Sequence, residues 1–140
     1  MAANPDSVLR TWFEELWNQG REETIDRLFA ADGLAHGLPG GAALRGPAEF
    51  KAFFRNFRGA FPDIRIEVLR TVTEGDLVAG HCRVVGTHKG DTMGKATGKP
   101  TEFSGMCILR VRDGQIVEGW NSFDFLTFYQ QLGLLPPLPA

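Results

Sequence analysis

The sequence predicts an α+β fold in which a curved antiparallel sheet wraps around N-terminal helices and a short C-terminal helix follows the last strand. Apolar residues recur at helical spacing up to about residue 60, whereas residues 64–123 show the two-residue alternation of β-strands. Tight turns at Glu74-Gly75-Asp76 and Asp113-Gly114 indicate that neighbouring strands are antiparallel. Helices that precede such a run of strands cover one face of the sheet. The chain has 140 residues, so we expect one domain over residues 1–140 with a substantial core.

Three helices and a short strand are expected before the long strands. In order, they are a helix that begins at Asn4 or Asp6 and ends by Gly20, a helix at residues 21–30, a strand at residues 33–38, and a helix from Gly46-Pro47 to about residue 60. The last of these helices has four phenylalanines on its inner side, namely Phe50, Phe53, Phe54 and Phe57.

Four longer strands make up the rest of the expected sheet. They cover residues 64–74, 77–88, 101–111 and 115 to about 123. Asp124 can cap a closing helix over residues 125–132, which Gly133 stops. Glycines inside the strands allow bends that curl the sheet. A curled sheet closed by helices leaves a conical hollow, and such hollows bind small apolar ligands.

Composition and charge exclude several classes of partner. A formal net charge of −2 argues against a nucleic-acid or an acidic-membrane surface. The apolar runs are far shorter than the ~20 residues of a membrane span. The N-terminus lacks a secretory signal pattern, and Cys82 and Cys107 lie in strand-like runs where reduced thiols are the default, so a cytoplasmic location is expected. No histidine pair has metal-ligand spacing, and residues 90–100 lack the P-loop pattern, so neither a metal nor a phosphate site is expected.

Three stretches together resemble the SnoaL-like polyketide cyclase group of the NTF2-like, or ketosteroid isomerase-like, superfamily. They are FKAFFRNFRGAFPDIRIEV, TEGDLVAGHCRVVGTH, and the run from Gly86 to Gly133 that contains SGMCILRVRDGQIVEGWNSFDFLTFYQQLG. The resemblance implies an NTF2-like cone with a pocket inside it, commonly in a homodimer. It also implies a cofactor-independent enzyme that acts on a small hydrophobic, carbonyl- or epoxide-bearing substrate by acid/base chemistry, as a cyclase, an isomerase or a hydrolase.

Two positions of the sequence depart from the family pattern. The resemblance implies a histidine on the penultimate strand and an aspartate after the tryptophan of the last strand, but this chain has Cys107 and Asn121 there. Asn121 exchanges no proton at useful pH, although its amide can donate hydrogen bonds to an oxyanion. An apolar pocket disfavours the thiolate of Cys107. The alternative function is therefore a non-catalytic small-molecule-binding or dimeric interaction domain.

The candidate catalytic residues are Asp124, Asn121 and His36. Asp124 is either a base that replaces the missing aspartate or only a helix cap, and a pocket-facing Asn121 either contacts ligand or ties down backbone. His36 is expected where the short strand meets the mouth of the cone. The candidate substrate-binding residues are Cys107, Trp120, Trp12, Phe54, His81 and Phe103. For Cys107 a core position is the favoured alternative, because free cysteines are among the most buried residues, and spacing leaves open whether His81 faces inward.

Overall fold

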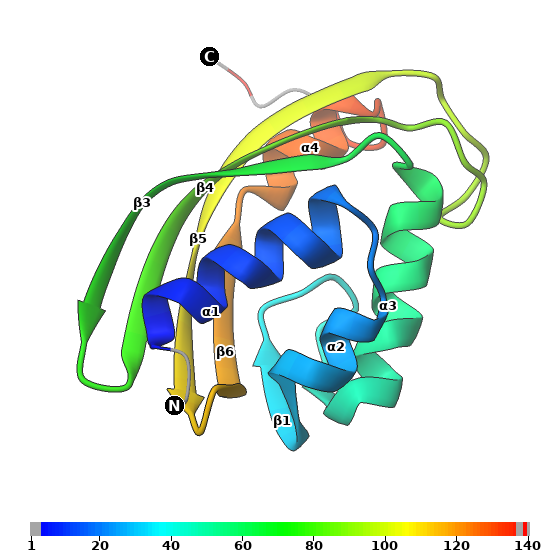
Figure 1. The fold of residues 1–140 in the computed structure, drawn as a ribbon. Coiled ribbons are helices and arrows are strands. Elements are labelled where there is room, and N and C mark those ends of the chain that lie inside the picture. The colour runs from blue at the N-terminus through cyan, green and yellow to red at the C-terminus, as the bar shows by residue number, and fades with distance from the viewer. Residues whose placement is uncertain (1–3, 137–138, 140) are drawn as a thin grey trace.

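The computed structural model describes residues 4–136 and residue 139, and it shows a curved six-stranded sheet wrapped around helices (Figure 1). The helical segments are α1 (Pro5–Thr11), its π-helical continuation η1 (Trp12–Asn18), α2 (Glu23–Leu28), α3 (Gly46–Ala60) and α4 (Phe125–Gln131). The strands are β1 (Phe29–His36), β2 (Leu44–Arg45), β3 (Arg65–Glu74), β4 (Leu77–Thr87), β5 (Pro100–Arg112) and β6 (Gln115–Phe123). The predicted α+β class is confirmed. The expected single domain also includes residues 1–3, 137–138 and 140, which lie outside the described residues.

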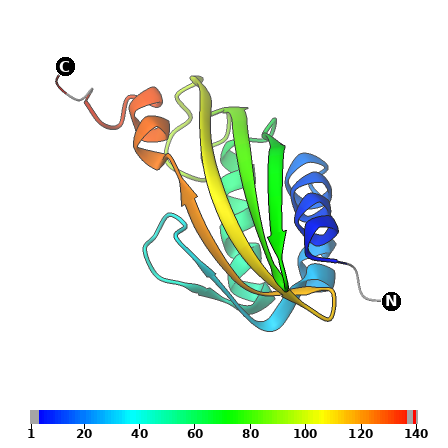
Figure 2. The same cartoon turned by 90° about the vertical axis from the view of Figure 1, so that its left-hand side faces the viewer.

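The strands lie in the order β2-β1-β6-β5-β4-β3. Strands β3 to β6 are antiparallel neighbours in chain order, and they bend together over the helices (Figure 2). β1 pairs with β6 in parallel, with Ala35 opposite Gly119. The predicted antiparallel sheet is therefore confirmed for the four long strands, and β1 adds one parallel pairing. β1 is also longer than the predicted strand at residues 33–38, because the chain leaves α2 directly into extended backbone at Phe29.

Local sequence signals set the ends of several elements. The side-chain oxygen of Asn4 accepts a hydrogen bond from the backbone N–H of Ser7 (2.8 Å), so Asn4 is the N-cap of α1. Asp113 (φ 52°) and Gly114 (φ 75°) both have left-handed backbone, as the two central residues of a type I′ hairpin turn do. The hairpin between β5 and β6 was predicted from this pair of residues, and it is confirmed.

The expected first helix has two geometries along its length. It begins as α-helix and continues as the π-helix η1, in which the backbone N–H of Gln19 donates to the carbonyl of Glu14 (3.0 Å). In an α-helix, residues five apart point about 140° apart around the axis. In a π-helix, five residues make roughly one turn, so Trp12 and Trp17 lie on the same side. Both side chains are buried against the sheet and α3.

Alternate residues of the long strands face the helices and the outside. In β5 the inward positions include Phe103, Cys107 and Leu109, all of them buried. In β4 the buried residues include Cys82, so His81 belongs to the outward set. This assignment settles which face of β4 points inward, a question that residue spacing alone left open.

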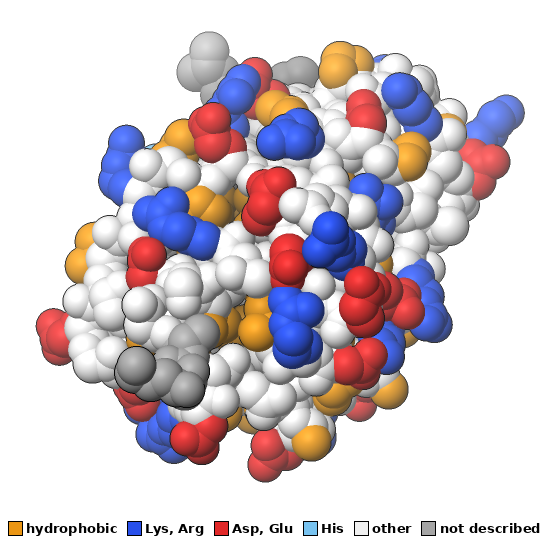
Figure 3. All heavy atoms as spheres, viewed as in Figure 1, with side chains coloured by type: hydrophobic (Ala, Val, Ile, Leu, Met, Phe, Trp, Pro, Cys, Tyr) orange, Lys and Arg blue, Asp and Glu red, His pale blue; other side chains and the backbone are white. Residues whose placement is uncertain are grey.

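The face formed mainly by α1, α2 and α3 carries interspersed acidic and basic side chains (Figure 3). Examples are the ion pairs Arg55–Glu22 (2.6 Å) and Lys51–Asp26 (2.8 Å), which link α3 to the region of α2. Because such surface pairs are exposed, each contributes at most about 1 kcal/mol to stability. Within residues 4–136, no helix is both long enough and apolar enough to cross a membrane.

Candidate functional site

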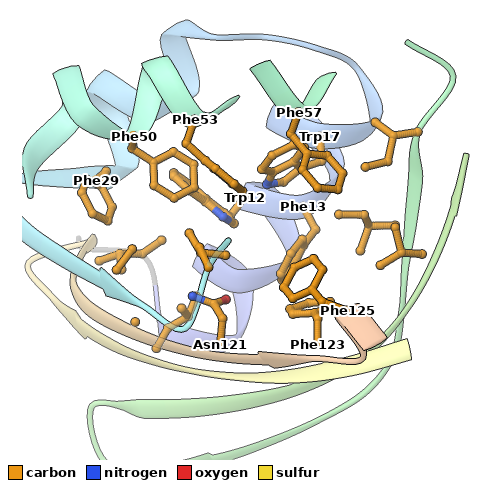
Figure 4. Close-up of a pocket in the computed structure, with 18 of the residues that line it drawn as sticks. Trp12, Phe13, Trp17, Phe29, Phe50, Phe53, Phe57, Asn121, Phe123 and Phe125 are labelled. Carbon is orange, nitrogen blue, oxygen red and sulfur yellow. The ribbon is translucent and has the colours of Figure 1, made fainter. Parts of the chain in front are cut away.

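η1, α3 and the inner face of the sheet enclose a cavity (Figure 4). It contains about 680 Å³ of empty space, counting its open mouth, but the centre of a water molecule fits in only about 70 Å³ of that space. The cavity is therefore a narrow slot between aromatic rings. The side chains labelled in Figure 4 around it are Trp12, Phe13, Trp17, Phe29, Phe50, Phe53, Phe57, Asn121, Phe123 and Phe125. Aliphatic side chains from the strands complete the wall, and every described lining residue is uncharged.

The π-helical geometry of η1 decides which aromatic side chains reach the cavity. Trp12, Phe13 and Trp17 all line it. Trp12 meets Phe50 edge-on, with the ring centroids 5.0 Å apart, and Trp17 meets Phe57 in the same way at 6.0 Å. Edge-to-face packing of this kind gives the wall a defined shape. Phe13 and Trp17 are not among the substrate-binding residues predicted from the sequence, and α-helical spacing does not place Trp12 and Trp17 on one side.

Asn121 is the one amide among the described lining residues. Its side-chain Nδ2 donates a hydrogen bond to the backbone carbonyl of His36 (2.9 Å), so it ties β6 to the end of β1. The two backbones are in close contact here, because a Cβ on Gly37 would lie 1.9 Å from the carbonyl oxygen of Asn121. Asn121 faces inward, as expected, and its role in holding backbone is observed. Its contact with a ligand stays a prediction.

Cys107 lies opposite Asn121 in the β5–β6 register and also points inward, but it does not line the cavity. Its side chain is 1% exposed, and Leu9 of α1 packs over the neighbouring Gly80. The prediction of a substrate contact at Cys107 is therefore corrected to a core position. The nearby Cys82 thiol, together with burial, raises the pKa of Cys107, so this thiol stays protonated and is no base.

Asp124 caps α4 and does not line the cavity. Its carboxylate accepts hydrogen bonds from the backbone N–H (3.0 Å) and the hydroxyl (2.6 Å) of Thr127. These bonds lower the pKa of Asp124, whose side chain is exposed. A carboxylate that acts as a base in an apolar cavity has a raised pKa, which is the opposite shift. The prediction of Asp124 as a catalytic base is thus corrected in favour of the helix cap.

The cap predicts how Asp124 variants behave. Asp124→Ala should lower the free energy of unfolding by about 1 kcal/mol. Asp124→Ser and Asp124→Asn should keep most of the stabilisation from the cap, since both side chains can accept a hydrogen bond from the N–H of Thr127. Because the pKa is lowered in the folded state, the contribution of the carboxylate is present above its unfolded pKa and is lost as pH falls through the folded pKa. Urea denaturation at neutral and acid pH measures both effects. Equal stability of the alanine and serine variants would contradict the cap.

His36, Trp120 and His81 lie on the outer face of the sheet, away from the cavity. His36 Nε2 is 2.7 Å from a carboxylate oxygen of Glu118, and its ring stacks on Trp120 with centroids 6.0 Å apart. His81 hydrogen-bonds with Arg70. The predicted pocket roles of these three residues are corrected because strand alternation gives the inward positions to their neighbours, such as Ala35 beside His36.

The remaining aromatic candidates divide between wall and core. Trp12 and Phe103 line the cavity, and their contact with a substrate stays a prediction. Phe54 does not line the cavity: it is buried on α3, where its ring packs edge-on against Trp17 at 5.1 Å. The prediction of a substrate contact at Phe54 is therefore corrected to a core position. In the described part of the chain, no group of three or more His, Cys, Asp or Glu side chains could hold a metal ion.

Comparisons with known proteins agree with this fold. Residues 7–132 match the model of the SnoaL-like polyketide cyclase family. The chain is 28% identical to the aklanonic acid methyl ester cyclase DnrD of Streptomyces peucetius, over 89% of this chain and 88% of that protein. It is similar to the structure of wild-type IdmH from Streptomyces antibioticus, with 34% identity, a TM-score of 0.80, and coverage of 94% of this chain and 99% of the other. A ketosteroid isomerase-like protein of Catenulispora acidiphila, 19% identical with a TM-score of 0.79, covers 99% of this chain and 100% of its own, and it bears on the fold alone.

Proposed function

Because this chain belongs to the SnoaL-like polyketide cyclase family, we propose that it binds a small, mostly apolar, carbonyl-bearing molecule in the cavity and promotes a cofactor-independent, cyclase- or isomerase-type reaction there. The observation that carries the proposal is the cavity wall. Aromatic and aliphatic side chains line a slot, and Asn121 is the one amide among them. Such a site suits flat, unsaturated molecules, which bury their rings between the aromatic side chains and present few polar atoms.

The uncharged wall favours catalysis by proximity and orientation of the ligand's reacting groups over acid/base catalysis by side chains. A narrow slot holds a flexible ligand folded, with its reacting atoms in contact, and this effect is worth up to about 7–11 kcal/mol in intramolecular reactions. An aldol-type ring closure moves one proton from carbon to oxygen within the ligand, so it needs no co-reactant. The described lining residues contain no group that could carry this proton. The ligand's own groups or water would do so.

A non-catalytic binding protein is the second candidate, and one observation favours it. Among the described residues that line the cavity there is no ionisable side chain, and the two positions where the family resemblance implies histidine and aspartate hold Cys107 and Asn121. A protein of this kind would bind the same class of ligand and leave it unchanged.

Tryptophan fluorescence tests binding, because Trp12 and Trp17 line the cavity while Trp120 lies outside it. In a Trp120→Phe background, 1-acetylnaphthalene or anthrone should quench most of the remaining emission in a saturable way. Ala35→Leu, which adds volume to the wall, should weaken this binding by at least about tenfold, whereas Leu34→Ile on the outer face should not. If neither ketone quenches, the proposal is wrong. Product analysis with aklanonic acid methyl ester, the compound in the name of the S. peucetius relative, then separates a cyclase from a binder.

We also propose that two copies of the chain associate through the outer face of the sheet. Met106, Ile108 and Trp120 form an exposed apolar patch there, called the outer patch, and Ile108 lies directly opposite Trp120 in the β5–β6 register. Exposed apolar patches of this kind mark interaction sites. Glu118 borders the outer patch on the β6 side and Arg70 on the β3 side. A twofold axis along the strands would lay the outer patch of each copy against that of the other.

Sedimentation measures this association. Wild-type protein should sediment as a dimer, and Ile108→Lys should sediment as a monomer, because the substitution places a charge at the centre of the outer patch. Leu126→Lys is the matched control: Leu126 is 46% exposed but lies on α4 and not on the outer face of the sheet, so the dimer should persist. A monomeric wild type would contradict the proposed dimer without affecting the cavity.

A further inference from the structure

The amide of Asn121 has a fixed orientation in the cavity. The carbonyl of His36 can only accept a hydrogen bond, so the atom of the Asn121 side chain that faces it must be the donor, Nδ2. The oxygen, Oδ1, is then turned to the other side. Figure 4 shows it on the side of the amide that faces Phe123 and the interior of the cavity. Asn121 therefore offers the cavity a hydrogen-bond acceptor, Oδ1, while one of the two N–H groups of Nδ2 is already engaged by the protein.

The opposite wall offers a donor. The indole nitrogen of Trp12 can only donate, and none of the hydrogen bonds made among the described residues uses it. Among the described residues, the side-chain polar atoms that are both fully buried and without a partner are Thr24 Oγ1 and His88 Nε2. The Trp12 nitrogen is not one of them, so this unpartnered atom is accessible and not sealed inside the protein. In Figure 4 the Trp12 nitrogen faces the space between α3 and the sheet. The π-helical turn of η1 thus leaves the indole N–H of Trp12 free to bind a ligand.

We infer that the ligand carries both a carbonyl and a hydroxyl group, with the carbonyl oxygen on the indole N–H of Trp12 and the hydroxyl donating to Asn121 Oδ1. This assignment rests on the proposed function, since it concerns the ligand of the same cavity. It reverses the role expected of Asn121 from the sequence, where the amide would donate to an oxyanion. Trp12 and Asn121 would therefore set specificity. A ligand that lacks the carbonyl leaves the indole N–H of Trp12 unpaired, and one that lacks the hydroxyl leaves Asn121 Oδ1 unpaired. An unpaired polar atom in an apolar slot costs more free energy than the hydrogen bond itself contributes.

Two pairs of probes of matched shape test the inference on the wild-type protein. The first pair, 1-acetylnaphthalene and 1-isopropenylnaphthalene, differs in the carbonyl, and the second, 2-naphthol and 2-methoxynaphthalene, differs in the hydroxyl donor. Titration calorimetry should show at least about fivefold tighter binding of the ketone and of the naphthol, which corresponds to one neutral hydrogen bond. Trp12→Phe should abolish the first preference alone, and Asn121→Leu the second alone.

Nuclear magnetic resonance of the indole N–H groups supplies a readout that does not depend on variants folding. The Trp12 resonance should move on addition of the ketone and much less with the isopropenyl analogue, while the resonance of Trp120, on the outer face, serves as the internal control. Equal affinities within both pairs, or an unmoved Trp12 resonance, overturn this inference and leave the proposed function standing. If none of the four probes binds, the inference and the proposed function fail together.

Discussion

Asn121→Asp is expected to destabilise the protein by about 1–3 kcal/mol at pH 7 and much less near pH 4. In the wild type, Asn121 Nδ2 donates to the carbonyl of His36. An ionised aspartate has no proton to donate, and it would place a charge between a carbonyl oxygen and an apolar wall. The protonated acid can still donate to this carbonyl. The folded state therefore raises the pKa of the new carboxyl group above its unfolded value of about 3.9.

The direction of the pH dependence follows from this raised pKa. A carboxyl group with a raised folded pKa binds more protons in the folded state, so stability is highest below the unfolded pKa and is lost as pH rises to the folded pKa. The quantity to measure is the difference in free energy of unfolding between variant and wild type, by urea denaturation from pH 4 to pH 7. Ser122→Asp is the control, because it adds the same charge at the next, exposed position. A difference that does not grow with pH would mean that the Asn121 side chain is not held against His36.

Phe128→Ala is expected to have the largest effect on folding, a loss of about 3–5 kcal/mol. Phe128 is fully buried, and its ring contacts Phe57 of α3, Phe61, and Phe103 of β5, with centroids 5.1–5.7 Å apart. The substitution removes the ring through which α4 packs against α3 and β5, and it leaves a cavity between these elements. Since single domains are stable by only about 5–15 kcal/mol, this loss would unfold a large fraction of the protein on mild heating.

The control for Phe128 lies on the same helix. Leu126 is 46% exposed, so Leu126→Ala should cost well under 1 kcal/mol although it changes a similar helical position. Chemical denaturation of both variants gives the comparison. Phe125, on the same helix, lines the cavity, so Phe128→Ala should also weaken the quenching of Trp12 and Trp17 by aromatic ketones. A loss below about 1 kcal/mol for Phe128→Ala would show that α4 does not depend on this contact.

Some features of the protein could be predicted from the chain because they depend on near neighbours. The alternation of β5 and β6, together with the register that the family resemblance implies, predicted that Cys107 and Asn121 face inward, and both do. Asp113-Gly114 predicted the hairpin, because few residue pairs tolerate left-handed backbone at both positions. The cap at Asp124 was one of two interpretations, and its hydrogen bonds to Thr127 span only three residues.

The features that decide the site depend on contacts between distant parts of the chain. Alternation within β1 does not say which strand it joins, and only its parallel pairing with β6 turns His36 and Trp120 outward together. α-Helical and π-helical turns accept the same residues locally, so packing of η1 against α3 and the sheet brings Trp17 into the wall. The sequence by itself determined the α+β fold, the alternation within the long strands and the turns, since these follow from local backbone preferences and a period of two. Tertiary structure alone decided which side chains surround the cavity and which way the Asn121 amide points, because both depend on non-local packing and on one hydrogen bond across 85 residues.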